Sequence, residues 1–168
     1  EHIEHKTGAY TTYSPVGVIA LILPWNFPFI VLCERLPFML AAGCTVVAKP
    51  SEYASGTCLL MGEILKESGI PDGVYNVLTG TGNPVGKSLV EHKDVAMISF
   101  TGSTENGRKV MESASKTIKK VSLELGGKSP IILFSDCDLD KAVSAIIDGF
   151  TENAGQCCIA TSRLLIEE

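Results

Sequence analysis

Residues 7–33 form a run without a single charged side chain, and no other feature of the sequence restricts the fold as strongly. The run is long enough to span a bilayer. However, Pro24-Trp25-Asn26-Phe27-Pro28 interrupts it, and the two halves, each of about ten residues, are too short to cross a membrane as helices. We therefore expect a strand buried on both faces over 16–23 and a buried helix over 27–42, with a kink at Pro37.

The rest of the chain alternates between short apolar segments and helical segments. Further strands are expected over 45–49, 74–78, 95–100, 120–125 and 130–134, with the beginning of another over 164–168. Helices are expected over 55–68, 84–92, 104–115 and 139–153. This alternation favours an α/β fold, a Rossmann-like parallel sheet with helices on both faces.

Length and composition narrow the classes of protein. The chain has 168 residues, the size of one domain or slightly more. Its net charge of −5 gives no electrostatic basis for binding nucleic acid, and the interrupted apolar run argues against a membrane protein. We expect no metal site, because no C-x-x-C pair and no zinc-type Cys/His spacing is present. The cysteines fit a reducing intracellular compartment, which we take to be the cytoplasm; they lie at 33, 44, 58, 137, 157 and 158.

Polar residues and glycines follow the expected strand ends. In an open parallel sheet, ligands bind at the carboxyl ends of the strands. The sequence therefore predicts a ligand site at this edge of the sheet. The residues that lie at or just after a strand end are Asn26, Lys49, Gly80, Gly102, Ser103 and Glu124.

The segment GTGNPVGKS at 80–88 resembles a phosphate-binding P-loop. That motif requires four residues between its glycines, whereas five separate Gly80 from Gly86. Pro84 also lacks a backbone N–H that would bind phosphate. The G-x-G-x-x-G pattern fails as well, because its third glycine comes one residue late. We interpret the segment as a glycine-rich turn near a nucleotide.

Five residues, in three groups, have both a functional and a purely structural interpretation. Ser103 begins a helix and is either an ordinary N-cap or also a donor to a bound phosphate. Lys49 and Glu52 either reach ribose hydroxyls or form a solvated surface pair. A free cysteine such as Cys157 or Cys158 is either a small core residue or, with a base to take its proton, a nucleophile.

Two further residues suit catalysis. Glu124 places a carboxylate at the end of an apolar strand, where it is a candidate general base. Gly126 and Gly127 follow it and are expected to leave space for a ligand. Asn26 is an amide held between two prolines, ready to donate to an oxyanion.

Together these segments resemble the aldehyde dehydrogenase superfamily, with the greatest similarity to its betaine-aldehyde and aminoaldehyde branch. The matching motifs occur in the family's order and spacing and cover essentially the whole chain. They are PWNFP at 24–28, AAGCTVVAKPSE at 41–52, GIPDGVYNVLTG at 69–80, FTGS at 100–103, LELGGKSP at 123–130 and GQCC at 155–158.

The resemblance implies a role for each matching residue. Cys158 corresponds to the nucleophile, Glu124 to the general base, and Asn26, with the backbone N–H of Cys158, to the oxyanion site. Cys157 corresponds to a variable neighbour. The implied cofactor is NAD, with NADP as the alternative. The resemblance places Leu23 and Trp25 in the cofactor cleft, Lys49 and Glu52 at the adenosine ribose, Ser103 at the pyrophosphate, and Gly82 and Gly86 on the adenine side. Further implied contacts are Ser51, Phe100, Gly102, Leu125 and Gly126.

The implied reaction is the NAD-dependent oxidation of a small aldehyde to an acid through a cysteine thiohemiacetal and a thioester. The resemblance also implies an oligomerisation arm over 1–15, part of a cofactor-binding domain over 16–125, and the start of a second α/β catalytic domain over 126–168. Members of the family are several hundred residues long, so we expect an internal fragment of a homodimeric or homotetrameric enzyme. The alternatives are a non-catalytic nucleotide-binding fragment and a P-loop-like NTPase.

Two acidic residues bear on specificity. Glu52 is expected to favour NAD, because a carboxylate repels the 2′-phosphate of NADP. Glu34 lies about two helical turns after Asn26, on the helix that lines the aldehyde tunnel in this family. An acid facing that tunnel would favour a cationic aldehyde. Alternatively, Glu34 pairs with Arg35 or a lysine and never contacts the substrate.

Overall fold

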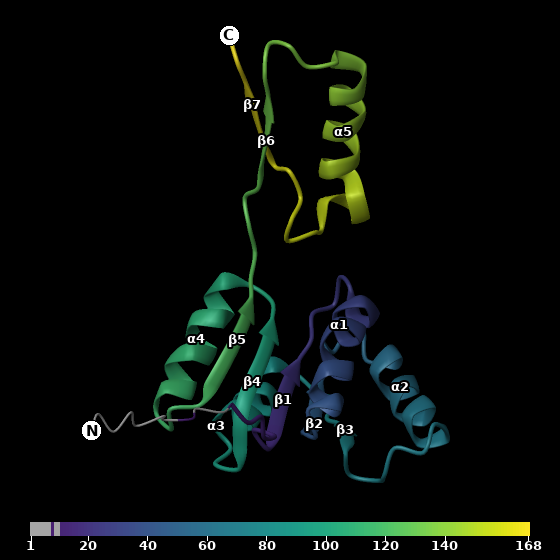
Figure 1. The fold of residues 1–168 in the computed structure, drawn as a ribbon, viewed down its shortest axis with the longest axis vertical. Coiled ribbons are helices and arrows are strands. Elements are labelled where there is room, and N and C mark those ends of the chain that lie inside the picture. The colour runs from purple at the N-terminus through teal and green to yellow at the C-terminus, as the bar shows by residue number, and fades with distance from the viewer. Residues whose placement is uncertain (1–7, 9–10) are drawn as a thin grey trace, which may run out of the picture.

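The structure is a computed structural model that describes residue 8 and residues 11–168, so most of the expected arm over 1–15 lies outside the described residues. Its main feature is a five-stranded sheet in the order β3-β2-β1-β4-β5, in which every neighbouring pair is parallel (Figure 1). The strands are β1 (Val18–Ile22), β2 (Thr45–Lys49), β3 (Tyr75–Val77), β4 (Val95–Thr101) and β5 (Lys120–Glu124).

Four helices cover the two faces of this sheet. The helices α1 (Pro28–Ala41) and α2 (Gly56–Glu67) pack on one face, and α3 (Lys87–Glu91) and α4 (Thr104–Ser115) pack on the other. The predicted architecture, a parallel sheet with helices on both faces, is therefore confirmed.

The central strand β1 explains why both faces need helices. Ile19 and Leu21 belong to the core that α1 and α2 cover, whereas Ala20 and Ile22 belong to the core beneath α3 and α4. All four side chains are at most 7% exposed. Successive residues of a strand point to opposite faces, so an unbroken apolar strand can be buried only between two helical layers. Burying one such aliphatic side chain contributes about 1.5–3 kcal/mol.

One helix prediction is confirmed and one needs correction. The helix expected over 27–42 is present as α1, which contains Pro37. Its buried residues Leu36 and Met39 flank the proline and anchor that turn to the sheet. The helix predicted over 84–92 begins later, because Gly82–Gly86 form a π-helical turn that contains an extended residue, Asn83. The regular helix therefore starts at Lys87.

A second, smaller unit follows β5. The strands β6 (Pro130–Leu133) and β7 (Arg163–Ile166) form a two-stranded parallel sheet, and α5 (Leu139–Thr151) connects them. Figure 1 shows this unit extending away from the five-stranded sheet. A 3-10 turn, Glu152–Gly155, then leads from α5 to the two adjacent cysteines. Among the described residues, no helix has both the length and the apolar character needed to cross a membrane.

Candidate active site

Two adjoining cavities lie at the carboxyl edge of the five-stranded sheet. The larger, of about 600 Å³, lies between α3 and α4, and the smaller, of about 420 Å³, lies among the loops that follow β1, β2, β4 and β5. Both are within the usual size range of ligand sites. The structure brings every predicted site residue to one of these two cavities. Gly86 lines the larger one. The predicted residues that line the smaller one are Leu23, Trp25, Asn26, Lys49, Ser51, Glu52, Gly82, Phe100, Gly102, Ser103, Glu124, Leu125, Gly126 and Cys158.

The helix α4 begins at the wall of the smaller cavity. Ser103 Oγ accepts a hydrogen bond from the backbone N–H of Asn106 at 3.3 Å, which confirms the predicted N-cap. The first intrahelical bond runs from the N–H of Gly107 to the carbonyl of Ser103 at 2.9 Å. The N–H groups of Thr104 and Glu105 precede that bond and point out of the helix end. Together with the helix dipole, they suit an anion such as a phosphate.

Lys49 ends β2 and is only 3% exposed. Its Nζ donates to the carbonyls of Pro50 at 2.8 Å and Gly80 at 2.7 Å, which ties β2 to the loop after β3. Burial lowers the pKa of the Lys49 ammonium, and the negative charge of Glu52 opposes part of that shift. The alternative of a solvated surface lysine is therefore wrong. An ammonium has three N–H donors, so one remains for a ligand in the cavity.

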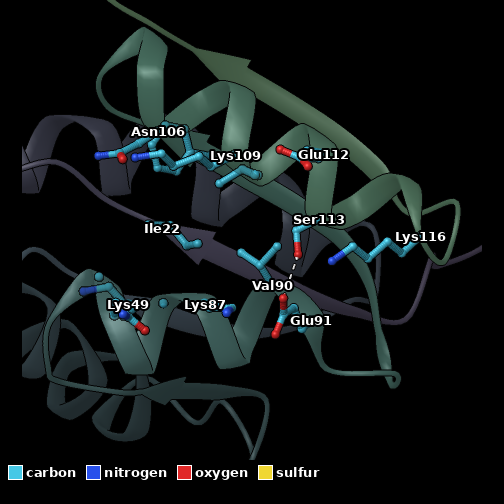
Figure 2. A pocket seen from close by; sticks show the side chains of 15 residues that line it. Ile22, Lys49, Lys87, Val90, Glu91, Asn106, Lys109, Glu112, Ser113 and Lys116 are labelled. Carbon is cyan, nitrogen blue, oxygen red and sulfur yellow. Dashed lines mark hydrogen bonds between the residues drawn. The ribbon is translucent and has the colours of Figure 1, made fainter.

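The larger cavity separates α3 from α4, as Figure 2 shows. Lys87 and Val90 line it from α3, and Asn106 and Lys109 line it from α4. The two helices are joined where Ser113 Oγ lies 3.3 Å from Glu91 Oε1 and donates to it (Figure 2). The cavity therefore has two helical walls and opens beside the glycines of the turn Gly82–Gly86.

Cys158 reaches the smaller cavity from the C-terminal unit. Asn26 Nδ2 donates to the backbone carbonyl of Gln156 at 2.8 Å, so the loop after β1 and the loop before β7 are directly bonded. A side-chain amide has two N–H donors, so the second N–H of Asn26 remains available to an oxyanion. Cys158 is exposed, whereas Cys157 is half-buried. The arrangement gives Cys158 the better access to a small molecule.

Gly127 makes room for the cysteine loop rather than for a ligand. A Cβ atom on Gly127 would lie 2.7 Å from the backbone carbonyl oxygen of Cys158. A larger residue would therefore push the cysteine loop away. The expectation that both glycines leave space for a ligand is wrong for Gly127, whereas Gly126 lines the smaller cavity.

Glu124 forms an ion pair across the cavity wall. Arg35 Nη2 on α1 lies 3.0 Å from Glu124 Oε1, and the two side chains are 25% and 58% exposed. A pair this exposed contributes only about 0–1 kcal/mol to stability. In the structure it directs one carboxylate oxygen of Glu124 toward Arg35. The predicted alternative that Glu34 pairs with Arg35 or a lysine is not what the structure shows. Arg35 pairs with Glu124 instead, and none of the ion pairs in the described part of the chain involves Glu34.

The sequence did not indicate the roles of three residues that shape this site. Arg35, Gly127 and Asn153 act through contacts with distant parts of the chain. The only local signal was the second glycine after Glu124. Within the described residues, no group of three or more His, Cys, Asp or Glu side chains could hold a metal ion.

Comparison with known proteins gives the family. A family model described as "Aldehyde dehydrogenase family" matches residues 1–168. The chain is 52% identical to aminoaldehyde dehydrogenase 1, peroxisomal, of Pisum sativum over 160 residues, which are 95% of this chain and 32% of that protein. Its identity to betaine aldehyde dehydrogenase 1 of Oryza sativa subsp. japonica is also 52% over 160 residues, with the same coverage. The chain thus spans about a third of the length of these relatives.

Solved structures agree in fold. The NAD-dependent aldehyde dehydrogenase from Sinorhizobium meliloti superposes with a TM-score of 0.90 at 55% identity, covering 92% of this chain and 31% of that one. Betaine aldehyde dehydrogenase from Staphylococcus aureus, solved in complex with NAD+, gives a TM-score of 0.89 at 40% identity, covering 92% and 30%.

The cap of α4 can be tested by its effect on stability. Replacing Ser103 with Ala removes the oxygen that accepts from the Asn106 N–H, and we expect the free energy of unfolding to fall by about 0.5–2 kcal/mol. Ser103→Thr keeps an acceptor and serves as the control. Urea unfolding of the chain followed by circular dichroism measures both. Equal stability of Ser103→Ala and the unaltered chain would contradict the assignment.

Proposed function

The chain belongs to the aldehyde dehydrogenase family, and we propose that the protein containing it oxidises an aldehyde to a carboxylic acid with NAD, through a thiohemiacetal and a thioester on Cys158. The observation that carries this proposal is the 2.8 Å hydrogen bond from Asn26 to the carbonyl of Gln156, which joins the oxyanion donor to the loop of the nucleophile. Glu124 lines the same cavity as both. Because the chain spans about a third of its relatives, the activity is proposed for the whole protein.

The residues at the carboxyl edge fit NAD. The remaining N–H of Lys49 and the carboxylate of Glu52 suit the adenosine ribose, and the N-terminus of α4 at Ser103 suits the pyrophosphate. The cavity beside Gly82 and Gly86 suits the adenine. When bound, NAD supplies the acceptor for a hydride. The other proposed contacts are Leu23, Trp25, Ser51, Phe100, Gly102, Leu125 and Gly126, all of which line the smaller cavity.

The proposed roles of the catalytic residues follow the order of the reaction. The Cys158 thiolate attacks the carbonyl carbon, a C–S bond forms, and the electron pair of the C=O bond moves to the oxygen. The free N–H of Asn26 and the backbone N–H of Cys158 donate to that oxyanion. After the carbon has lost a hydride, Glu124 takes a proton from water, which attacks the thioester. The C–S bond then breaks and returns the thiolate.

Arg35 has a place in this scheme that the sequence did not suggest. Its guanidinium holds one oxygen of Glu124 at 3.0 Å from outside the smaller cavity, since Arg35 is not among the residues that line it. The second carboxylate oxygen remains able to accept a proton from water. We assign Arg35 to the orientation of the general base.

The proposal favours NAD over NADP. Glu52 lines the smaller cavity beside Lys49, and a carboxylate can accept from both ribose hydroxyls. A 2′-phosphate at the same place would meet a like charge at short range, which is unfavourable. Lys49 has one N–H donor left for the cofactor, because its other two are bonded to backbone carbonyls.

The alternative functions differ in support. A P-loop NTPase is not supported, because residues 82–86 form a π-helical turn. The chain also belongs to a different family. A nucleotide-binding module without catalysis keeps one supporting observation, the chain's coverage of about a third of its relatives. Aldehyde-dependent formation of NADH distinguishes the two, because a binding module alone produces none.

We also propose the domain organisation, the oligomeric state and the cellular compartment of the protein. The two separate sheets support a cofactor-binding domain over 16–125 and the start of a catalytic domain over 126–168. The proposed arm over 1–15 and a homodimer or homotetramer follow from the family alone. Six free cysteines support a reducing compartment such as the cytoplasm, although the names of relatives include peroxisomal and chloroplastic enzymes.

The two cysteines should differ in their effect on catalysis. In the complete protein, Cys158→Ala should abolish the aldehyde-dependent formation of NADH, because no other residue of the cavity supplies the thiolate. Cys157→Ala should retain most of it, because Cys157 does not line the cavity. Binding of NADH, followed by its fluorescence, should be unchanged in both. Equal loss of activity in the two variants would show that the nucleophile is assigned wrongly.

The substrate class is proposed as cationic, an amino- or trimethylammonio-aldehyde. The names of the relatives support it, since they include aminoaldehyde and betaine aldehyde dehydrogenases. Glu34 is exposed on α1 and lines neither cavity of the described residues. The names of the relatives, and not a contact of Glu34 with either cavity, therefore support this proposal.

The role of Glu34 can be measured directly. In the complete protein, Glu34→Gln should lower kcat/KM for betaine aldehyde relative to a neutral aldehyde of similar size by about tenfold, which corresponds to about 1.4 kcal/mol. Glu63→Gln, on α2, removes an acid distant from the site and serves as the matched control. An unchanged ratio in Glu34→Gln would remove Glu34 from substrate recognition.

A further inference from the structure

Two consecutive residues before the cysteines adopt a left-handed backbone. Asn153 has φ 49° and ψ 40°, and Ala154 has φ 58° and ψ 31°. Among the described residues, the only other non-glycine residue with positive φ is Ile118. Asparagine tolerates this region, but alanine adopts it rarely, because its Cβ meets the following carbonyl. Such backbone persists only where surrounding contacts hold it.

The contacts that hold this turn involve Asn153. Its backbone carbonyl accepts from the N–H of Gln156 at 3.1 Å. Its Nδ2 lies 3.4 Å from the carbonyl of Gln156 and 3.4 Å from the carbonyl of Asn26, and donates to both. Asn26 Nδ2 in turn donates to the same carbonyl of Gln156 at 2.8 Å. Three residues thus form a closed network that joins the loop after β1 to the loop of the nucleophile.

A second contact holds the cysteine loop beyond this network. None of the residues of the turn Glu152–Gly155 is buried among the described residues. On the other side, the carbonyl of Cys158 lies against Gly127, at a place where a Cβ would come within 2.7 Å. The cysteine loop is therefore held at Gln156 by hydrogen bonds and at Cys158 by a close backbone approach.

We propose that Asn153 is a positioning residue for the nucleophile: its left-handed backbone and its amide together fix the carbonyl of Gln156, and through it the direction of Asn26 and the place of Cys158. The proposal rests on the proposed function for its effect on catalysis. Its effect on the reactivity of the Cys158 thiol does not depend on which reaction the protein performs.

Three variants of the complete protein separate the backbone of Asn153 from its amide. Asn153→Gly keeps the left-handed turn and removes the amide, because glycine adopts positive φ freely. Asn153→Ala removes the amide and also disfavours the turn. Ala154→Gly relieves the strained residue, leaves the amide in place and is the control. The probe is iodoacetamide, and mass spectrometry of the digested protein reports the rates of alkylation at Cys158 and Cys157 separately.

We expect Asn153→Ala to change the ratio of Cys158 to Cys157 alkylation at least threefold and to lower kcat by about 10- to 100-fold, as misplacement by about 1 Å does. Asn153→Gly should fall between Asn153→Ala and the unaltered protein, and Ala154→Gly should match the unaltered protein. The dissociation constant of NADH should stay constant throughout. In an Asn26→Ala background, Asn153→Ala should lower kcat by less than threefold further, because the network is already broken.

Several results would overturn the proposal. An alkylation ratio that is the same in Asn153→Ala and the unaltered protein would show that Asn153 does not position Cys158. A full additional loss of kcat in the Asn26→Ala background would show that the two asparagines act independently. If the protein oxidises no aldehyde but the alkylation ratio responds as expected, the proposed function fails while the positioning role of Asn153 stands.

Discussion

Burial of β1 on both faces is the constraint on which the rest of the structure depends. The strand lies at the centre of the sheet, between β2 and β4, and its side chains alternate between two separate cores. Two helical layers are needed to cover it. The chain therefore leaves β1 toward one face to form α1 and returns for β4, which α3 and α4 cover from the other face. The strand order reverses between β1 and β4, and this is where a parallel sheet opens a crevice for a ligand.

The crevice becomes a candidate active site only because a second unit supplies the proposed nucleophile. The loops of the five-stranded sheet bring Asn26, Glu124 and the proposed cofactor contacts to the smaller cavity, whereas Cys158 comes from the segment between α5 and β7. Side-chain hydrogen bonds connect the two units: Asn26 donates to the carbonyl of Gln156, and Asn153 donates to the carbonyl of Asn26. Hydrogen bonds are directional, so we expect single polar side chains to have a large effect on the place of Cys158.

The sequence predicted most of the fold, and the failures have physical causes. The bounds of β2 and α4 were predicted to the residue, since one is a β-branched run between turn residues and the other has Ser103 as a cap. The helix predicted over 84–92 was placed too early, because Gly82–Gly86 form a π-helical turn that contains the extended residue Asn83. In the site, motifs gave the residue types, but the Arg35–Glu124 pair and the approach of Cys158 to Gly127 join distant segments. No local pattern specifies such contacts.

The central claim is that Cys158 carries the substrate as a covalent adduct. Its most direct test is mass spectrometry of the complete protein, quenched with acid within milliseconds of mixing with NAD and betaine aldehyde. Fragmentation of the peptide that contains both adjacent cysteines locates any added acyl group. The account predicts the acyl group on Cys158, appearing together with NADH and disappearing as the aldehyde is consumed. Formation of NADH with the acyl group on Cys157, or with no adduct on either cysteine, would contradict it.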